Sequence, residues 1–276
     1  MPRRFRFAAL FALVLAVLPA LAFAQGTRLR LSWDHCAAEG YVADRSFACN
    51  TNTGEDVLVA SAVLGDEVPH ATLAAFLGYL DFRATSPNLP IWWQVSAGMC
   101  RQNALNLQAS GLIASPLCTP WYLADGTSTQ EPLTVAQFEY YSDGANSSRI
   151  GFGAVVPAGF EITLPNGSQE FVFARLRILH SKTTGSVSCS GCQVPMCIGF
   201  GLLLLQYPGQ IDNTYPIKGT TASTVTWQGA YASSYEPVGG YKMSGHTVPY
   251  HGNLGCASGP VPAQGRTWGM IKAFYR

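Results

Sequence analysis

The chain has 276 residues, a formal net charge of +1 and only 12% charged side chains. No run of basic residues follows the first six positions, which excludes the phosphate-neutralising surface that a nucleic-acid-binding protein needs. Glycine and aromatic residues are plentiful, and the long Glu/Lys/Leu/Ala stretches of helical proteins do not occur, so the composition is typical of extracellular β-proteins.

The first residues have the pattern of an export signal. Three arginines fall within the first six positions, an apolar run extends from Phe7 to Phe23, and Ala22-Phe23-Ala24 precedes Gln25. This order predicts a signal peptide at residues 1–24. Its removal takes away three of the 17 basic residues, which leaves 14 against 16 acidic residues and a net charge of −2. No later apolar run is long enough to cross a bilayer, so we expect a secreted or periplasmic protein that does not span the membrane.

The mature chain, residues 25–276, is predicted to form one β-sandwich domain with a loop-rich region at about 208–266. Strand patterns occur, in chain order, at Thr27–Trp33, Val57–Val63, Leu77–Phe82, Ile91–Val95, Arg149–Val156, Phe171–His180, Ile198–Tyr207 and Val225–Trp227. Short helices are expected at Asn103–Ser110 and Thr267–Tyr275. Turn sequences punctuate these runs, which favours an all-β fold: an antiparallel, jelly-roll-like β-sandwich with long disulfide-stapled loops.

The two strongest strand patterns are Phe171–His180 and Ile198–Tyr207. One Cys-rich connection joins them, and we expect it to be too short for anything but a link between neighbouring strands. The sequence therefore predicts that these two strands pair in one sheet.

All eight cysteines follow the predicted cleavage site, and an even number in an exported chain indicates disulfides. They are Cys36, Cys49, Cys100, Cys118, Cys189, Cys192, Cys197 and Cys256. Proximity favours Cys36–Cys49 and Cys100–Cys118, with the other four paired among themselves and Cys256 tied to the Cys189–Cys197 loop. The spacing Cys-x2-Cys-x4-Cys also leaves open part of a zinc knuckle or a redox pair, but thiolates are disfavoured in an oxidising compartment.

No catalytic motif stands out. A Gly-x-Ser-x-Gly elbow does not occur, and the strand-end residue His180 is expected to hydrogen-bond the Cys-rich loop. His246 and His251 have a spacing that a metal could use, although exposed polar surface is the commoner explanation for such a pair. The acidic residues that could supply a glycosidase pair show no signature in their spacing; they are Glu139, Asp143, Glu161 and Glu170. We therefore predict no metal and no cofactor, and the sequence leans away from an enzyme.

Aromatic residues offer the best hint of a binding surface. Trp121-Tyr122 directly follows Cys118-Thr119-Pro120, so its backbone is expected to be restrained. Trp92-Trp93 lies in a predicted strand, where adjacent side chains point to opposite faces and one ring could be exposed. These four residues are the predicted ligand-binding site, with core packing as the alternative for each tryptophan.

Three sequence blocks carry a resemblance: Trp33-Asp34-His35-Cys36 with Phe47-Ala48-Cys49-Asn50-Thr51-Asn52-Thr53-Gly54; His180-Ser181-Lys182-Thr183-Thr184-Gly185 with Cys189-Ser190-Gly191-Cys192 and Pro195-Met196-Cys197; and Thr267-Trp268-Gly269 with Ile271-Lys272 and Tyr275-Arg276. The chain resembles a group of uncharacterised secreted bacterial proteins. That resemblance implies export and a shared cysteine framework, and it implies no activity.

These observations lead to one function and two alternatives. The first is a secreted, non-catalytic β-sandwich that binds a glycan or another extracellular or cell-surface partner. The alternatives are a secreted hydrolase acting on polysaccharide and a structural subunit of an extracellular assembly. A groove with two facing carboxylates would favour hydrolysis, a flat aromatic platform would favour binding, and a large apolar patch would favour assembly.

Overall fold

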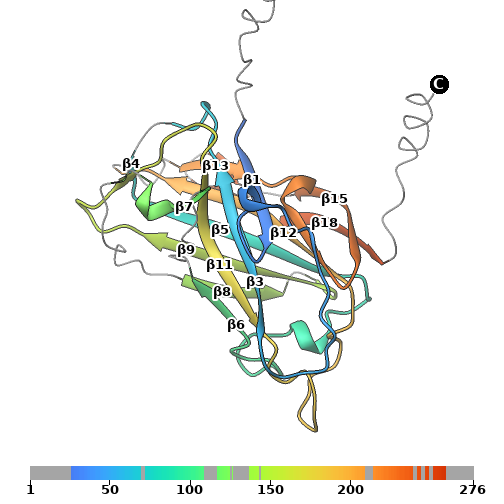
Figure 1. Cartoon of the computed structure of the whole chain (residues 1–276). Helices are drawn as coiled ribbons and strands as arrows, with labels where there is room; N and C mark the ends of the chain where they lie inside the picture. The colour runs from blue at the N-terminus through green and yellow to red at the C-terminus, as the bar shows by residue number, and fades with distance from the viewer. Residues whose placement is uncertain are drawn as a thin grey trace, which may run out of the picture.

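The computed structural model describes residues 26–69, 72–108, 117–124, 126, 137–142, 144–208, 214–238, 241–243, 246–248 and 251–258. Nearly all the regular secondary structure of these residues is β-strand, arranged in two packed layers (Figure 1), and the predicted antiparallel β-sandwich with disulfide-stapled loops is confirmed. No helix in these described ranges is long and apolar enough to cross a bilayer. The predicted signal peptide and the predicted terminal helix Thr267–Tyr275 lie outside the described residues.

The first sheet has the strand order β1-β3-β11-β6, and β7 pairs with β11 beside β6. Its strands are β1 (Arg28–Trp33), β3 (Glu55–Val63), β6 (Leu105–Gln108), β7 (Cys118–Pro120) and β11 (Glu170–Leu179). All pairings are antiparallel except β7 with β11, which is parallel. Proline can sit in β7 because that strand is short and lies at an edge.

The second sheet has the order β2-β14-β12-β5-β9-β8, and β13 pairs with β12. Its strands are β2 (Asp44–Arg45), β5 (Ala75–Ala84), β8 (Gln137–Ser142), β9 (Ser147–Val155), β12 (Met196–Gln206), β13 (Thr214–Lys218) and β14 (Thr224–Trp227). Only the short β14–β2 pair is parallel. In Figure 1 the long strands of this sheet cross behind those of the first sheet.

Three small ribbons and four 3-10 turns complete the described fold. The ribbons are β4 (Thr72–Leu73) with β10 (Ile162–Thr163), β15 (Ala230–Val238) with β18 (His251–Ser258), and β16 (Tyr241–Met243) with β17 (His246–Val248). The turns are η1 (Ala37–Glu39), η2 (Ile91–Trp93), η3 (Trp121–Leu123) and η4 (Thr221–Ser223).

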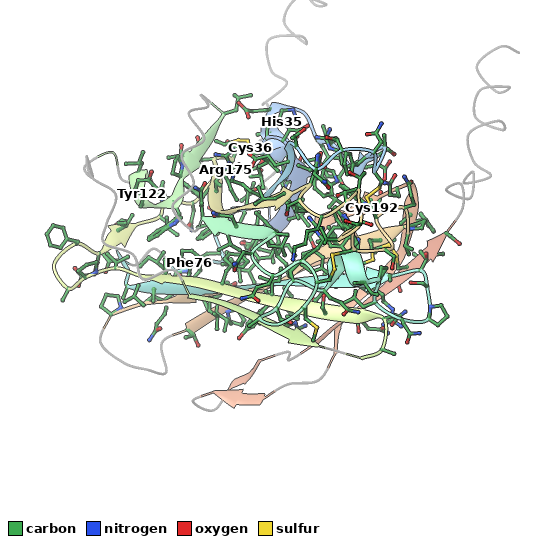
Figure 2. All side chains as sticks on the ribbon, turned by 90° about the horizontal axis from the view of Figure 1, so that it is seen from below. His35, Cys36, Phe76, Tyr122, Arg175 and Cys192 are labelled. Atoms are coloured by element: carbon green, nitrogen blue, oxygen red, sulfur yellow. A yellow bond between two sulfur atoms is a disulfide. The ribbon has the colours of Figure 1, made fainter. Side chains whose placement is uncertain are left out.

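The core lies between the two sheets and is rich in aromatic rings. Alternate residues of β1, namely Leu29, Leu31 and Trp33, point into it, as period-two strands require. Trp227 of β14 is the centre of a ring cluster, with Trp92 stacked on it at 5.4 Å and Trp33 at 5.9 Å between centroids. Figure 2 shows the side chains that fill the space between the layers. These contacts join loops and both sheets into one apolar cluster.

The expected pairing of Phe171–His180 with Ile198–Tyr207 is wrong. Both are strands, but β11 pairs with β3, β6 and β7, whereas β12 pairs with β5, β13 and β14. The connection 180–195 crosses from one layer to the other. Packed sheets lie about 10 Å apart, a distance that this many residues span easily.

Two local predictions are also wrong. Ile91–Val95 is not a strand, because Pro90 starts the 3-10 turn η2, which the Trp93 N–H closes on the Pro90 carbonyl at 2.9 Å. The helix expected at Asn103–Ser110 is replaced by β6. Asn103 has a positive φ of 67°, which interrupts any helix, and the next residues pair with the exposed edge of β11.

The ribbon β15–β18 covers part of the outer face of the second sheet. Tyr235 of β15 donates its hydroxyl hydrogen to Asp81 of β5, and the Arg149 Nε of β9 donates to the same carboxylate at 2.6 Å. All three side chains are buried. Gly201 of β12 leaves room for the ring, because a Cβ there would overlap the Tyr235 hydroxyl and Asp81.

Tyr235→Phe tests this buried contact. Burial, and then the Asp81 carboxylate, raise the pKa of Tyr235 well above its ordinary value of 10. The folded protein therefore keeps the phenol neutral while the unfolded chain ionises it, so the stabilisation is complete below pH 10 and is lost as pH rises toward the folded pKa. We expect Tyr235→Phe to lower the free energy of unfolding by about 2 kcal/mol at pH 8.

Denaturant unfolding of the wild type and of Tyr235→Phe at pH 8 to 11 measures this contribution. The difference between them should shrink above pH 10, by at most about 1.4 kcal/mol per pH unit. A difference that is constant across this range would contradict a neutral, buried phenol at Asp81.

Candidate functional site

The eight cysteines form four disulfides, and their pairing differs from the expected one. The pairs are Cys36–Cys118, Cys49–Cys192, Cys100–Cys189 and Cys197–Cys256. The predicted tie of Cys256 to the Cys189–Cys197 loop is confirmed. The predicted pairs Cys36–Cys49 and Cys100–Cys118 are wrong. Cys189 and Cys192 are predicted to pair within the last four cysteines, but they pair with Cys100 and Cys49. Sequence neighbours fail to pair because loops from distant parts of the chain meet at the ends of the two sheets.

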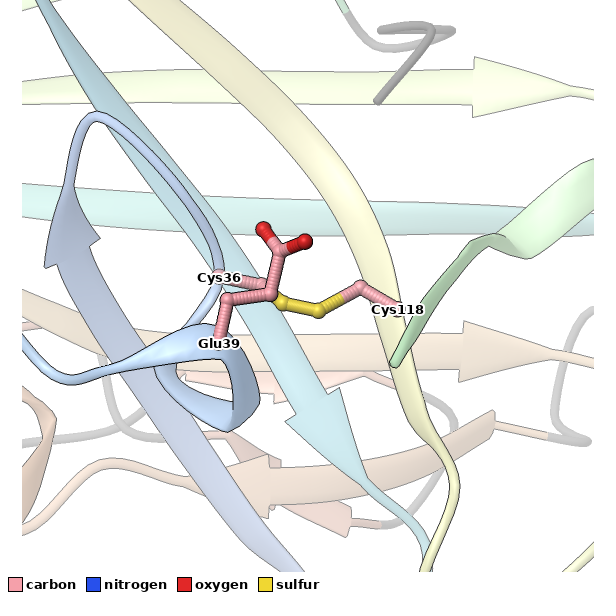
Figure 3. Close-up of side chains that lie close together, drawn as sticks. All are labelled: Cys36, Glu39 and Cys118. Atoms are coloured by element: carbon pink, nitrogen blue, oxygen red, sulfur yellow. A yellow bond between two sulfur atoms is a disulfide. The ribbon is translucent and has the colours of Figure 1, made fainter. Parts of the chain in front are cut away.

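No cysteine remains as a free thiol for zinc, and Cys189 and Cys192 are bonded to different partners and not to each other as a Cys-x2-Cys redox pair is. Every sulfur is in a disulfide, and a thiolate, not a disulfide, is the metal ligand and nucleophile. Cys36, Glu39 and Cys118 do cluster like metal ligands on the outer face of the first sheet (Figure 3). Because Cys36 and Cys118 are bonded to each other, Glu39 is the only usable donor there, and this cluster is a structural staple.

The predicted aromatic binding site lies in the core. Trp121 and Trp92 are 0% exposed, and Tyr122 and Trp93 are 2% exposed. Both pairs occupy 3-10 turns that follow a proline, where adjacent side chains are not forced to opposite faces as in a strand. The edge of Trp121 meets Phe76 at 5.1 Å between centroids, and Figure 2 labels Phe76 and Tyr122 within the packed interior. These rings stabilise the fold and cannot form an exposed platform.

The candidate carboxylates and histidines do not form a catalytic pair within the described residues. Glu170 is buried, accepts from Arg30 at 2.8 Å and from the Ala37 N–H at 2.9 Å, and also accepts from Ser61. Glu161 is exposed, and a backbone hydrogen bond from Gly159 lowers its pKa. The side chains of Glu139, Asp143, His246 and His251 lie outside the described part of the structure.

His180 holds a buried position at the end of β11. Its Nε2 lies 2.8 Å from Asp56 Oδ2 and its Nδ1 lies 3.1 Å from the Thr53 carbonyl oxygen. The ring of Phe47 stacks on the imidazole at 3.8 Å between centroids. Since both ring nitrogens are engaged, neither can take a proton from a substrate or a nucleophile. His180 contacts the Cys-rich connection only through its carbonyl, which accepts from Thr183 Oγ1. The partners of its ring are Thr53, just before β3, and Asp56 of β3.

Three segments meet at one end of the sandwich, which we call the stapled end: residues 46–54, 85–104 and 180–195. Cys49–Cys192 and Cys100–Cys189 join them, each with its Cα atoms 6.0 Å apart. In Figure 1 this is the lower end of the molecule, where the loop around residue 185 projects furthest.

Arg101 fixes the interior of the stapled end. Its guanidinium donates to the Trp92 carbonyl at 2.8 Å, to the Ser181 carbonyl at 3.2 Å and to the Leu179 carbonyl, and it lies 3.4 Å from the centroid of the Trp92 ring. Burial lowers the pKa of Arg101 to about 9, so the group stays protonated at neutral pH. One cation thus links η2 to the end of β11 through carbonyl oxygens and an aromatic face.

The projecting loop, residues 182–188, is held at its base from three sides. Asn52 Oδ1 accepts from the N–H groups of Thr183 and Thr184 at 2.7 and 2.8 Å, and its Nδ2 donates to the Thr184 carbonyl at 3.1 Å. The Cys189 N–H closes the loop on the Lys182 carbonyl at 2.8 Å. The Lys182 Nζ donates to the Cys100 carbonyl at 2.6 Å. A surface loop with this many fixed contacts is pre-ordered.

The stapled end exposes aliphatic side chains and carries almost no charge. Val187 is 71% exposed, Met99 is 47% exposed and Ile91 is 45% exposed. Val187 and Met99 lie beside the Cys100–Cys189 bond, and the residue after Ile91 donates its N–H to the Ser190 carbonyl. Among Asp, Glu, Lys and Arg, the three segments contain only the buried Arg101 and Lys182. Interface cores have this composition: apolar, Met-containing and depleted of charge.

Aromatic residues in the sequence do not point to this site, because its exposed side chains are aliphatic. The useful signal is the clustering of four cysteines in segments that almost lack charged residues. Asn52 lies in a block that carries the resemblance, but only the folded chain brings its amide to Thr183 and Thr184.

Arg101→Met should destabilise the protein by about 3 kcal/mol, because the buried Trp92 carbonyl and the part-buried Leu179 and Ser181 carbonyls lose their donor while the side-chain volume is largely kept. Chemical denaturation at neutral pH measures the effect. Arg177→Met is the matched control, since Arg177 pairs with Glu55 on an exposed face and its loss should change stability little. Equal effects of the two substitutions would contradict the structural role of Arg101.

No family model matches the chain, and a search of curated proteins finds no similar sequence. The resemblance to secreted bacterial proteins therefore stays a prediction. The arrangement of the stapled end is the observation on which a function can be argued.

Proposed function

We propose that this protein is an exported, non-catalytic binding module that docks an extracellular protein partner through its stapled end. Export is supported by the predicted signal peptide and by the four disulfides, which persist in oxidising compartments. The observation that carries the proposal is the rigid loop 182–188, which presents Val187 at 71% exposure from a base held by Asn52 and Cys189.

Rigidity and exposure together favour recognition. An apolar side chain at a loop tip gains no burial on folding but gains it when a partner covers it, and a pre-ordered loop loses little entropy on binding. Ile91 and Met99 are further exposed apolar side chains of the stapled end. Hydroxyl groups of the same segments, on Thr51, Ser186 and Ser188, offer the polar rim of a protein–protein interface.

A protein partner is better supported than a glycan. Glycan-binding sandwiches stack a sugar on an exposed aromatic face, but the tryptophans that the structure describes are buried: Trp33, Trp92, Trp93, Trp121 and Trp227. The stapled end exposes aliphatic groups instead. Hydrolysis has less support, because in the described part of the chain Glu170 is locked into an ion pair and His180 has no free ring nitrogen.

Val187→Asp tests the docking surface. A random peptide library displayed on phage and panned against the mature protein provides the probe. Peptides selected on the wild type should bind the variant roughly 5- to 150-fold more weakly, the range that corresponds to the loss of one hot-spot side chain. The thermal midpoint should stay unchanged, because Val187 is mostly exposed.

Phe160→Asp is the matched control for that experiment. Phe160 is 68% exposed in the turn between β9 and β10, at the end of β9 away from the stapled end, so its substitution should leave peptide binding unchanged. A glycan array probed with the same proteins tests the alternative ligand. Glycan binding that survives Val187→Asp, or peptides that lose affinity only for Phe160→Asp, would contradict docking at the stapled end.

Asn52→Ala tests whether loop order matters for binding. Removing the amide leaves the N–H groups of Thr183 and Thr184 without their acceptor, so their hydrogen exchange should speed up and peptide binding should weaken several-fold. Asn52→Asp keeps a side-chain oxygen at the same place and should preserve most of the protection. If both variants bind peptide as the wild type does, pre-ordering of the loop is not part of recognition.

A further inference from the structure

His180 joins the two sides of the stapled end at the base of the projecting loop. Its backbone N–H donates to the Gly54 carbonyl at 3.0 Å, and its own carbonyl accepts from Thr183 Oγ1. Its ring reaches Thr53 and Asp56 on the segment that enters β3. Asn52, which clamps the loop, is the residue before Thr53. The imidazole therefore links the start of the projecting loop to the segment that contains Asn52.

Both acceptors of this ring require a donor. The Thr53 carbonyl oxygen cannot donate a hydrogen bond, and neither can an ionised Asp56. An imidazolium ring donates from both nitrogens and satisfies both acceptors. A neutral ring carries one N–H only, so one nitrogen lone pair then faces an oxygen lone pair, whichever tautomer forms. The geometry thus suits the protonated ring.

The charged groups around the ring also favour a protonated imidazole. Asp56 of β3 faces His180 and lies 3.3 Å from Arg45 Nε of β2, and Arg45 in turn pairs with Asp34 after β1. Phe47 covers one face of the ring without charge. Glu55 is paired with Arg177, and Lys182 is held by the Cys100 carbonyl. The carboxylates of Asp56 and Asp34 and the guanidinium of Arg45 then carry a net charge of −1, which an imidazolium neutralises.

We propose that protonation of His180 locks the loop 182–188 and that its deprotonation loosens it. This inference rests on the proposed function. A locked loop makes docking at the stapled end stronger at mildly acidic pH than at alkaline pH. The sign follows from the bonds: the protonated ring makes two hydrogen bonds and the neutral ring makes one. The link is complete while the ring is protonated and is lost when rising pH removes that proton.

Hydrogen exchange of the loop amides tests the switch without any partner. The N–H groups of Thr183, Thr184 and Cys189 are the reporters, because each is bonded at the loop base. After correction for the intrinsic exchange rate at each pH, their protection should fall about tenfold from pH 5 to pH 8, the equivalent of one net hydrogen bond. His180→Gln should show the same protection at both values.

His35→Gln is the matched control, because His35 lies apart from the loop base and its variant should keep the full pH dependence. If His180→Gln does not fold, nitrogen-15 NMR of the wild type gives the same answer: the loop amides and the His180 ring must titrate with one midpoint. Protection that is flat in the wild type, or a pH dependence that persists in His180→Gln, would overturn the switch.

The binding measurement separates this inference from the proposed function. Loop protection that titrates in a protein whose selected peptides ignore Val187→Asp supports the switch and refutes docking. Peptides that depend on Val187 but bind equally at pH 5 and pH 8, with flat loop protection, support docking and refute the switch.

Discussion

The crossing of the chain from one sheet to the other between β11 and β12 is the constraint on which the rest of the structure depends. Residues 180–195 leave the first layer and enter the second, and two disulfides hold them, Cys100–Cys189 and Cys49–Cys192. Each of these bonds joins segments far apart in sequence, 89 and 143 residues respectively. Closing loops of that length restricts the unfolded chain strongly, so the crossing gains stability that its few apolar contacts alone would not provide.

Around the crossing, polar side chains form hydrogen bonds that link separate segments of the chain. Arg101 donates to carbonyls at the end of β11 and in η2, the His180 ring bonds Asp56 of β3, and the Trp92 Nε1 donates to Thr183 at 3.0 Å. Buried polar groups are costly when unpaired, and here each pairing also links two separate pieces of chain. The same contacts that let an irregular segment be buried at its base make its exposed tip rigid.

The tryptophan cluster fills the core, whereas the disulfides hold the surface loops of the stapled end. Trp33, Trp92, Trp93 and Trp227 fill the core directly above the crossing, so the aromatic residues that suggest a binding platform in the sequence stabilise the fold instead. The surface that remains for recognition is made of small hydroxyl residues and a few aliphatic side chains.

The sequence by itself determined the fold class and the chemistry of the sulfur atoms. Period-two patterns such as Phe171–His180 mark half-buried strands, and apolar runs such as Ile198–Tyr207 mark strands that are buried on both faces. The strands β1, β3, β5, β9, β11, β12 and β14 lie where these two kinds of pattern predict. An even number of cysteines behind an export signal predicts full pairing, and all eight are paired. Both inferences depend on local patterns or on simple counts, which a single sequence contains.

Only the tertiary structure decided which strands are neighbours, which cysteines pair and which aromatic residues are exposed. Cys36 meets Cys118, and not the nearer Cys49, because β1 and β7 flank the same pair of strands. Trp92 and Trp121 point inward because a proline turns the chain into a 3-10 turn just before each of them. Asn52, Arg101 and His180 act on residues about 80 to 130 positions away. Such contacts depend on how two sheets stack, and no pattern within one segment encodes the geometry of another.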